Sequence, residues 1–280
     1  MKRISLFILL GTIIFACSQG AAPPIDTEIA TSPYTHGRVV WHNLASPDPE
    51  ASASFYEAVF GWNAVPYGEG NRKVWVYQKS GEPIALMAQY RTKDGSGEWI
   101  GAISVPNVDE AVEKARSMGA AVLEDTRVSE SLGTVGFIQD AQGANISFIK
   151  FTNGDPEPGF PETDDFLGLE LWSNNPEESI SFYTDIIGYQ TAKMDGVGID
   201  YTMFQMDGKN CASVMQNPAE DTRSHWVPYV RVSDLNATVA KVKSAGGTML
   251  VEPSPEIRGG TAALFLDPTG APMAIQVYNP

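Results

Sequence analysis

The chain has 280 residues, 43% of them hydrophobic and 19% charged, which is enough for about two globular domains with buried cores. Its 34 acidic and 19 basic residues give a formal net charge of −15. This charge argues against binding nucleic acid by phosphate neutralisation and against electrostatic docking on anionic lipid. We therefore expect no nucleic-acid partner. The two cysteines, Cys17 and Cys211, do not form a disulfide framework.

Residues 1–17 have the pattern of a secretion signal. Two basic residues, Lys2 and Arg3, precede twelve mostly apolar residues, and the stretch ends at Ala16-Cys17. The apolar stretch is too short to cross a hydrocarbon core of ~30 Å as a helix. Its end resembles a bacterial lipobox, in which the cysteine receives lipid. The alternative is an ordinary signal peptide with an incidental cysteine.

The segment that follows Cys17 predicts a lipid-anchored protein on a flexible tether. Residues 18–37 are rich in small and polar residues and in proline, as linkers are. Ser18 directly after the cysteine resembles the outer-membrane lipoproteins of double-membraned bacteria. We expect anchoring in the cell envelope, at the outer membrane facing the periplasm, with membrane contact through the anchor only.

The rest of the chain contains one repeat at a constant offset of 127 residues. The matching positions are aromatic, glycine and acidic residues, and they include Phe55-Tyr56 with Phe182-Tyr183, Trp99 with Trp226, and Asp140 with Asp267. The sequence thus predicts a first module over 38–151 and a second over 165–280. The acidic, Pro- and Gly-rich residues 152–164 between them have the composition of a linker.

Each module is itself double. Glycines placed to end a helix recur 58 residues apart, at Gly61 and Gly119 and again at Gly188 and Gly246. Each unit has the pattern of a strand, a helix and two or three further strands, and its first example opens with a strand over 38–45. The chain is therefore expected to contain four successive units of one kind.

Helix boundaries are marked in both modules. Asp48 is a candidate N-cap followed by Pro49, and Gly61 is placed to end that helix. Asn175 and Pro176 repeat the arrangement in the second module. We expect one helix to begin at each of these pairs.

These motifs, in this order and twice over, resemble the vicinal oxygen chelate superfamily of glyoxalases, bleomycin-resistance proteins and dioxygenases. The residues that carry the resemblance are Phe55-Tyr56 with Gly61, Val232-Ser233-Asp234 and the turn Asp267-Pro268-Thr269-Gly270. The resemblance implies an α+β fold of tandem βαβββ modules, with four units forming two cupped mixed sheets. Within it, the chain looks most like two-module glyoxalase-like proteins, for which ligand binding has been suggested.

Metal-using members of this superfamily take His, Gln or Glu ligands from the first and last strands of each unit. The motifs align these positions with Trp41, Ala85, Ile100, Ser147, Gly168, Ala212, Val227 and Ala274. None of the eight offers an imidazole or carboxylate donor. We expect no metal and no cofactor, which argues against metal-dependent isomerase or dioxygenase chemistry.

Strand alternation indicates which side chains line the cups. In the second module the polar face carries a carboxylate, a guanidinium, two aromatic rings and an imidazole, from Glu170, Arg231, Trp172, Tyr229 and His225. Because Glu170 and Arg231 lie on the opening strands of two paired units, we expect them to pair or to hold opposite ends of a ligand. The first module offers the plainer face, with Trp41 and Asn43.

The sequence therefore favours a monomeric, metal-independent small-molecule binding protein of the cell envelope. One alternative is a metal-dependent lyase, isomerase or dioxygenase with a rebuilt site in the second module. Another is a structural or interaction protein whose cups are filled by side chains. Metal content separates the first two, and the space in the cups separates the third.

Overall fold

The computed structural model describes residues 33–67, 73–90, 95–129, 132–157, 159–194, 201–219 and 222–279. The predicted leader, its Cys17 and most of the tether lie outside the described residues. No helix in these ranges is both long and apolar enough to cross a membrane.

The secondary structure repeats in four units of one helix and four strands. The first module contains β1 (Val39–Ser46), α1 (Pro49–Phe60), β2 (Asn63–Tyr67), β3 (Val74–Lys79), β4 (Glu82–Gln89), β5 (Glu98–Ser104), α2 (Val108–Ser117), β6 (Ala121–Ser129), β7 (Gly133–Gln139) and β8 (Asn145–Lys150). The second contains β9 (Phe166–Ser173), α3 (Pro176–Ile187), β10 (Gln190–Lys193), β11 (Tyr201–Met206), β12 (Lys209–Gln216), β13 (His225–Arg231), α4 (Leu235–Ser244), β14 (Thr248–Val251), the short helix η1 (Arg258–Gly260), β15 (Ala262–Leu266) and β16 (Pro272–Gln276).

The predicted helix signals are confirmed. The Asp48 carboxylate accepts a hydrogen bond from the Ala51 amide at the start of α1, and Asn175 caps α3 in the same way. Both helices end at a glycine in the left-handed region, Gly61 with φ of 74° and Gly188 with φ of 88°. A residue with a Cβ would be strained there, which explains why the repeat keeps glycine at this place.

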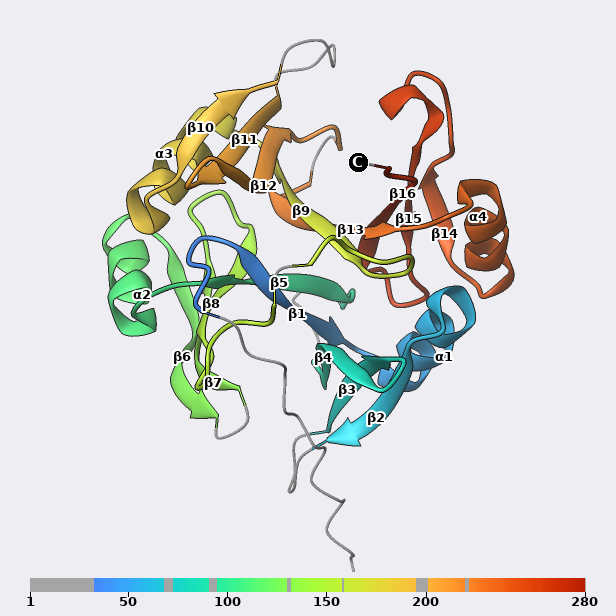
Figure 1. Ribbon diagram of the computed structural model, residues 1–280, viewed down its shortest axis with the longest axis horizontal. Coiled ribbons are helices and arrows are strands. Elements are labelled where there is room, and N and C mark those ends of the chain that lie inside the picture. Colours follow the sequence, from blue (N-terminus) through green and yellow to red (C-terminus); the bar gives the residue numbers. More distant parts are fainter. Residues whose placement is uncertain are drawn as a thin grey trace, which may run out of the picture.

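Each module forms one mixed sheet of eight strands among the described residues. The strand orders are β2-β3-β4-β1-β5-β8-β7-β6 and β10-β11-β12-β9-β13-β16-β15-β14. The first and fourth strands of a unit pair in parallel, and the two units of a module join through the antiparallel pairs β1–β5 and β9–β13. The predicted α+β fold of two tandem modules is therefore confirmed (Figure 1).

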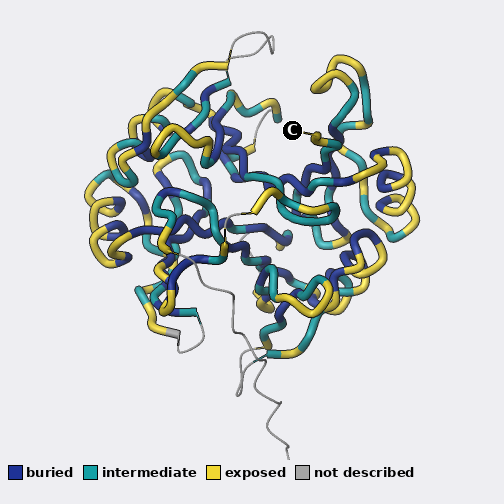
Figure 2. Tube along the Cα trace, viewed as in Figure 1, coloured by how far each residue is buried: buried dark blue, intermediate teal, exposed yellow. Residues whose placement is uncertain are grey.

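The two main hydrophobic cores are shared between the modules. One core joins α1 and its strands to α4 and β13, β15 and β16, while the other joins α2 and its strands to α3 and β9, β11 and β12. Figure 1 shows α1 beside α4 and α2 beside α3, and Figure 2 shows the buried chain concentrated in the central strands. The helix-covered face of each sheet is thus closed by the other module, and the concave faces point outward.

A buried hydrogen-bonded chain crosses between the modules at the second of these cores. The Trp226 indole donates to the Tyr183 hydroxyl at 3.0 Å, and that hydroxyl donates to Asp140 Oδ2 at 2.8 Å. Burial raises the pKa of the Asp140 carboxyl, and the hydrogen bonds from Tyr183 and from the amides of its own turn oppose that rise. A carboxylate of one module is therefore held by a phenol of the other.

The repeat brings the equivalent residues together at the first core. Trp99 donates to the Tyr56 hydroxyl at 2.7 Å, and burial and the nearby charge of Asp267 of the other module raise the pKa of Tyr56 well above its ordinary value. The Phe-Tyr, Trp and Asp residues that recur in the sequence thus lie at the contact between the two modules.

His42 also lies at the boundary between the modules. Its ring stacks on Phe166 of β9 with centroids 3.7 Å apart, and its buried Nδ1 atom has no hydrogen-bond partner among the described residues. Burial lowers the pKa of His42 from 6.5 to about 3, because a charged imidazolium would be desolvated there. The folded protein therefore holds His42 in the neutral form.

This burial predicts acid sensitivity with a defined sign. The unfolded chain takes up a proton at His42 below about pH 6.5 and the folded chain only near pH 3, so stability falls as pH falls through that window. The slope from this group reaches about 1.4 kcal/mol per pH unit. His42→Phe, which keeps a ring against Phe166, should flatten the fall in urea-unfolding free energy between pH 6 and pH 4. An unchanged slope would contradict this assignment.

Candidate functional site

The concave face of the second sheet is lined by side chains that alternate with core-facing ones. On β9, Gly168, Glu170 and Trp172 share this face. The strand register places Ser213 of β12 and Val227 of β13 on either side of Glu170. Glu170 therefore lies at the centre of the cup, on β9, which pairs with β13 to join the two units of the module.

The Glu170 carboxylate is buried, with 2% of the residue exposed, and both of its oxygens accept hydrogen bonds. Oε1 accepts from Trp172 Nε1 at 2.8 Å and from the Tyr229 hydroxyl at 2.9 Å. Oε2 accepts from Ser213 Oγ at 3.3 Å and from Arg258 Nη2 at 2.5 Å. An unpaired buried charge would cost several kcal/mol, so the guanidinium is what makes this ionised group tolerable.

Arg258 reaches the cup from the turn between β14 and β15. Its guanidinium lies over the rings of Tyr201 and Tyr229, 5.2 and 5.0 Å from their centroids, and Nη2 also donates to the Tyr201 hydroxyl at 3.1 Å. One third of the side chain is exposed. The backbone of Arg258 has φ of 49°, a left-handed conformation that few residues with a Cβ adopt. The turn thus directs one cation over two aromatic rings at the rim.

The two tyrosines act as hydrogen-bond donors at neutral pH. Burial and the nearby Glu170 charge, opposed by Arg258, raise the pKa of Tyr201 to about 12 and that of Tyr229 well above its ordinary value. Tyr201 donates to Ser213 Oγ at 2.7 Å, and this serine donates to Glu170. The cup therefore presents a fixed polar network within aromatic walls.

Three of the residues predicted from strand alternation, Glu170, Trp172 and Tyr229, meet in this network. His225 lies beside them, with its ring 5.4 Å from the ring of Trp172 and its Nδ1 hydrogen-bonded to the Arg223 carbonyl at 3.0 Å. Burial lowers the pKa of His225, which favours its neutral form.

The expected pairing of Glu170 with Arg231 is wrong. Arg231 Nε donates to the Tyr278 carbonyl at 2.9 Å and Nη1 to the Pro161 carbonyl at 3.2 Å, and the guanidinium lies over the ring of Phe160. Arg231 ends β13, where the segment before β9 and the C-terminal segment present carbonyl acceptors to it. The Arg231 guanidinium therefore binds carbonyl groups at the end of β13. The ion pair with Glu170 that was predicted for Arg231 is made by Arg258.

Sequence reasoning missed Tyr201, Ser213 and Arg258. Tyr201 and Ser213 lie on the second and third strands after α3, and their parity becomes clear only once the register with Glu170 is known. Arg258 stands in the Arg258-Gly259-Gly260 segment, whose glycines between two strand patterns indicate only a turn. The signal available was one basic residue inside a turn that joins two strands of the same unit.

The cup of the first module is filled where that of the second is open. Trp41, at the position equivalent to Gly168, is 4% exposed and packs with Ala102, Ile149 and Phe151. A Cβ built on Gly168 would meet no atom within 4 Å. Asn43, at the position of Glu170, makes one long contact of 3.5 Å with a backbone carbonyl. The two cups thus differ in the space left at this position and in the charge of the side chain that follows it on the same face.

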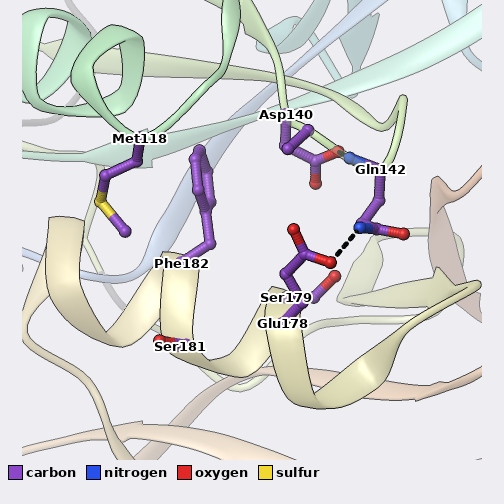
Figure 3. Close-up of a pocket in the computed structure, with 8 residues that line it drawn as sticks. Met118, Asp140, Gln142, Glu178, Ser179, Ser181 and Phe182 are labelled. Atoms are coloured by element: carbon purple, nitrogen blue, oxygen red, sulfur yellow. Dashed lines mark hydrogen bonds between the residues drawn. The ribbon is translucent and has the colours of Figure 1, made fainter.

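A second hollow, of about 270 Å³, lies at the seam between the modules (Figure 3). It is lined by Met118, Asp140, Ala141, Gln142, Glu178, Ser179, Ser181 and Phe182. Several of its polar groups are already paired, since Gln142 donates to Glu178 at 2.6 Å and Asp140 accepts from Tyr183. We therefore interpret its polar lining as part of the module contact and take the second cup as the candidate site.

The superfamily's metal positions do not form a metal site in the described part of the chain. No group of three or more His, Cys, Asp or Glu side chains that could hold an ion occurs there. Two of the positions derived from the alignment were wrong by one residue: Ala85 and Ala212 pack into the shared cores. The register places Leu86 opposite Asn43 and Ser213 opposite Glu170 on the cup faces instead. Neither Leu86 nor Ser213 is a usual ligand for a divalent ion.

Two family models match the chain in tandem. The model of the glyoxalase/bleomycin resistance protein/dioxygenase superfamily matches residues 166–275, and that of a glyoxalase-like domain matches residues 41–149. The chain belongs to this superfamily. The two matches coincide with the two modules described above.

Among relatives in this superfamily, the protein named "Putative glyoxylase CFP32" of Mycobacterium tuberculosis is 29% identical over 251 residues, covering 86% of this chain and 94% of that protein. The anthracycline biosynthesis protein DnrV of Streptomyces peucetius is 24% identical over 260 residues, with the same coverage.

Solved structures share the fold at lower identity. The Mn(II)-bound glyoxalase from Novosphingobium aromaticivorans has a TM-score of 0.60 at 13% identity, covering 86% of this chain and 82% of that one. Homoprotocatechuate 2,3-dioxygenase from Brevibacterium fuscum, in complex with 3,4-dihydroxyphenylacetate, has a TM-score of 0.60 at 14% identity, covering 91% and 84%.

Proposed function

We propose that this chain is a metal-independent small-molecule binding protein of the cell envelope, and that it binds its ligand in the cup of the second module. The observation that carries the proposal is the open space over Gly168, on the strand that also presents Glu170. In the first module an indole occupies the equivalent space.

The surroundings of that space suit a small planar ligand. Trp172, Val227, Tyr229 and Leu264 form an apolar cluster on the cup face, and the Glu170 network sets polar groups among them. Binding sites of this kind are mostly apolar, with a few polar groups fixed in advance. Because the network is already hydrogen-bonded, a ligand meets a preorganised surface.

Metal independence rests on the donor set of the cup. Glu170 is the carboxylate at its centre, and its oxygens accept four hydrogen bonds, one from an arginine. A divalent ion would have to displace that arginine and gather further ligands that the cup-facing positions do not provide. The competing proposal is a metal-dependent lyase, isomerase or dioxygenase, and the similar fold of the Mn(II)-bound glyoxalase favours that alternative.

The envelope location rests on the leader, with Lys2 and Arg3, the apolar stretch and Cys17 in sequence. In this proposal the lipid on Cys17 anchors the protein, residues 18–37 act as the tether, and the chain is a monomer.

Gly168→Trp tests the site by giving the second cup the side chain that the first one has. Ligands found by a thermal-shift screen of small aromatic compounds should lose at least about tenfold in affinity, or about 1.4 kcal/mol, because the indole takes their space. The matched control is Trp41→Phe in the first cup, which should cost about 1–3 kcal/mol of stability and leave binding intact. Ligands that bind Gly168→Trp as well as the parent chain would refute the site.

Metal independence is tested on the same ligands. Dialysis against EDTA should change neither the melting temperature nor the thermal shift that a ligand produces, because no ion takes part. One tightly held ion per chain, lost in both His225→Ala and Glu170→Ala, would overturn this and favour the enzyme.

The anchor predicts a lipid-modified N-terminus. Mass spectrometry of mature protein should find Cys17 as the first residue with acyl chains attached, and the protein should partition into detergent. Cys17→Ala should abolish the acylation. An unmodified N-terminus, or cleavage at another residue, would contradict the anchor.

A further inference from the structure

Arg258 uses only part of its hydrogen-bonding capacity. Nη2 makes both of its hydrogen bonds, to Glu170 and to Tyr201. Nε and Nη1 have no hydrogen-bond partner among the residues that the structure describes, and one third of the side chain is exposed. A guanidinium has five N–H donors, so several remain for a group that enters the cup.

The guanidinium is also fixed in orientation. The rings of Tyr201 and Tyr229 lie 5.2 and 5.0 Å from its central carbon, and the bond to Glu170 holds one end. A planar fork of donors held in place matches the two oxygens of a carboxylate, and little side-chain entropy remains to be lost on binding. Other anions of similar size would also be attracted, but a carboxylate fits this planar geometry best.

The groups around Arg258 indicate what such a carboxylate would be attached to. Trp172 and Tyr229 supply aromatic walls, and Gly168 leaves room beside them. Glu170 stands at the centre of the same face and would repel an anion that came too close. The ligand's acid must therefore stay at the rim with Arg258, while an apolar ring occupies the space over Gly168.

We propose, on the basis of the function proposed above, that the ligand of the second cup is an aromatic carboxylic acid whose carboxylate binds the free donors of Arg258. The net charge of −15 acts against anions at long range, but at physiological salt charges more than about 8 Å apart are largely screened. The direct contact with Arg258 therefore decides the preference.

The test uses calorimetry on the full mature chain, with benzoate, phenylacetate and 1-naphthoate as probes and their primary amides as neutral partners. The acids should bind at least about tenfold more tightly than the amides. Arg258→Met should remove that advantage and leave the amides little changed. Arg231→Met is the matched control, because this arginine is used at the end of β13, and it should leave acid binding unchanged.

Glu170→Gln separates charge recognition from a structural role. It removes the negative charge that competes for Arg258 and keeps the side-chain shape, so the acids should bind more tightly while the amides change little. If Arg258 and Glu170 only held the cup together, both variants would weaken acids and amides alike, which would overturn the proposal.

Other outcomes are also decisive. Acids that bind no better than amides, with both displaced by Gly168→Trp, would overturn the ligand class and leave the binding function standing. Tighter binding of benzylamine by Arg258→Met would identify Glu170 as the anchor of a cationic ligand, against the proposal. Absence of acid binding at millimolar concentration would refute it too, and ligands indifferent to Gly168→Trp would refute the site itself.

Discussion

The fold depends on the burial of each module's helix-covered face against the other module. Tyr183 shows why the contact is specific as well as apolar. Its hydroxyl accepts from Trp226 of its own module and donates to Asp140 Oδ2 of the other, whose Oδ1 accepts from amides of its own turn. One oxygen of a buried carboxylate is therefore hydrogen-bonded across the seam. Separating the modules would expose two apolar faces and remove the Tyr183 hydrogen bond from Asp140, and the exposed apolar surface is a large cost against the marginal stability of a domain.

This division assigns different tasks to the two faces of each sheet. The core side is held by residues that the repeat keeps in both modules, because each must match a partner on the other side. The cup side has no such constraint, so the two copies have diverged there. In the first cup Trp41 packs among apolar side chains, and Asn43 next to it on the same face carries no charge. In the second cup Gly168 leaves open space, and the equivalent neighbour is the buried Glu170 carboxylate. At the position of Trp41 and Gly168 the first cup is packed with apolar side chains, and the second leaves space above the sheet.

The architecture could be predicted from the sequence because the patterns that indicate it are local or periodic. Caps, helix-ending glycines and the constant offset fix the units, and alternation placed Glu170 and Tyr229 on one face. Arg258 was not readable, since its approach depends on a left-handed turn and on tertiary contacts far away in sequence. Arg231 has the right parity, but it lies where a strand ends and carbonyls compete for it. Ala212 shows the limit of motif alignment, because a shift of one residue reverses the face.

The shared cores also bear on the order in which the chain can fold. The first unit, β1 to β4 with α1, completes its core with β13 to β16 and α4, the fourth unit in chain order. These contacts have large sequence separation, which slows folding, because long loops must close before the contacts form. Until then Phe55 and Val59 of α1 have no complete partner surface, and a partly synthesised chain presents them to solvent or to a chaperone. The first core of the nascent chain therefore stays incomplete until the first and fourth units meet.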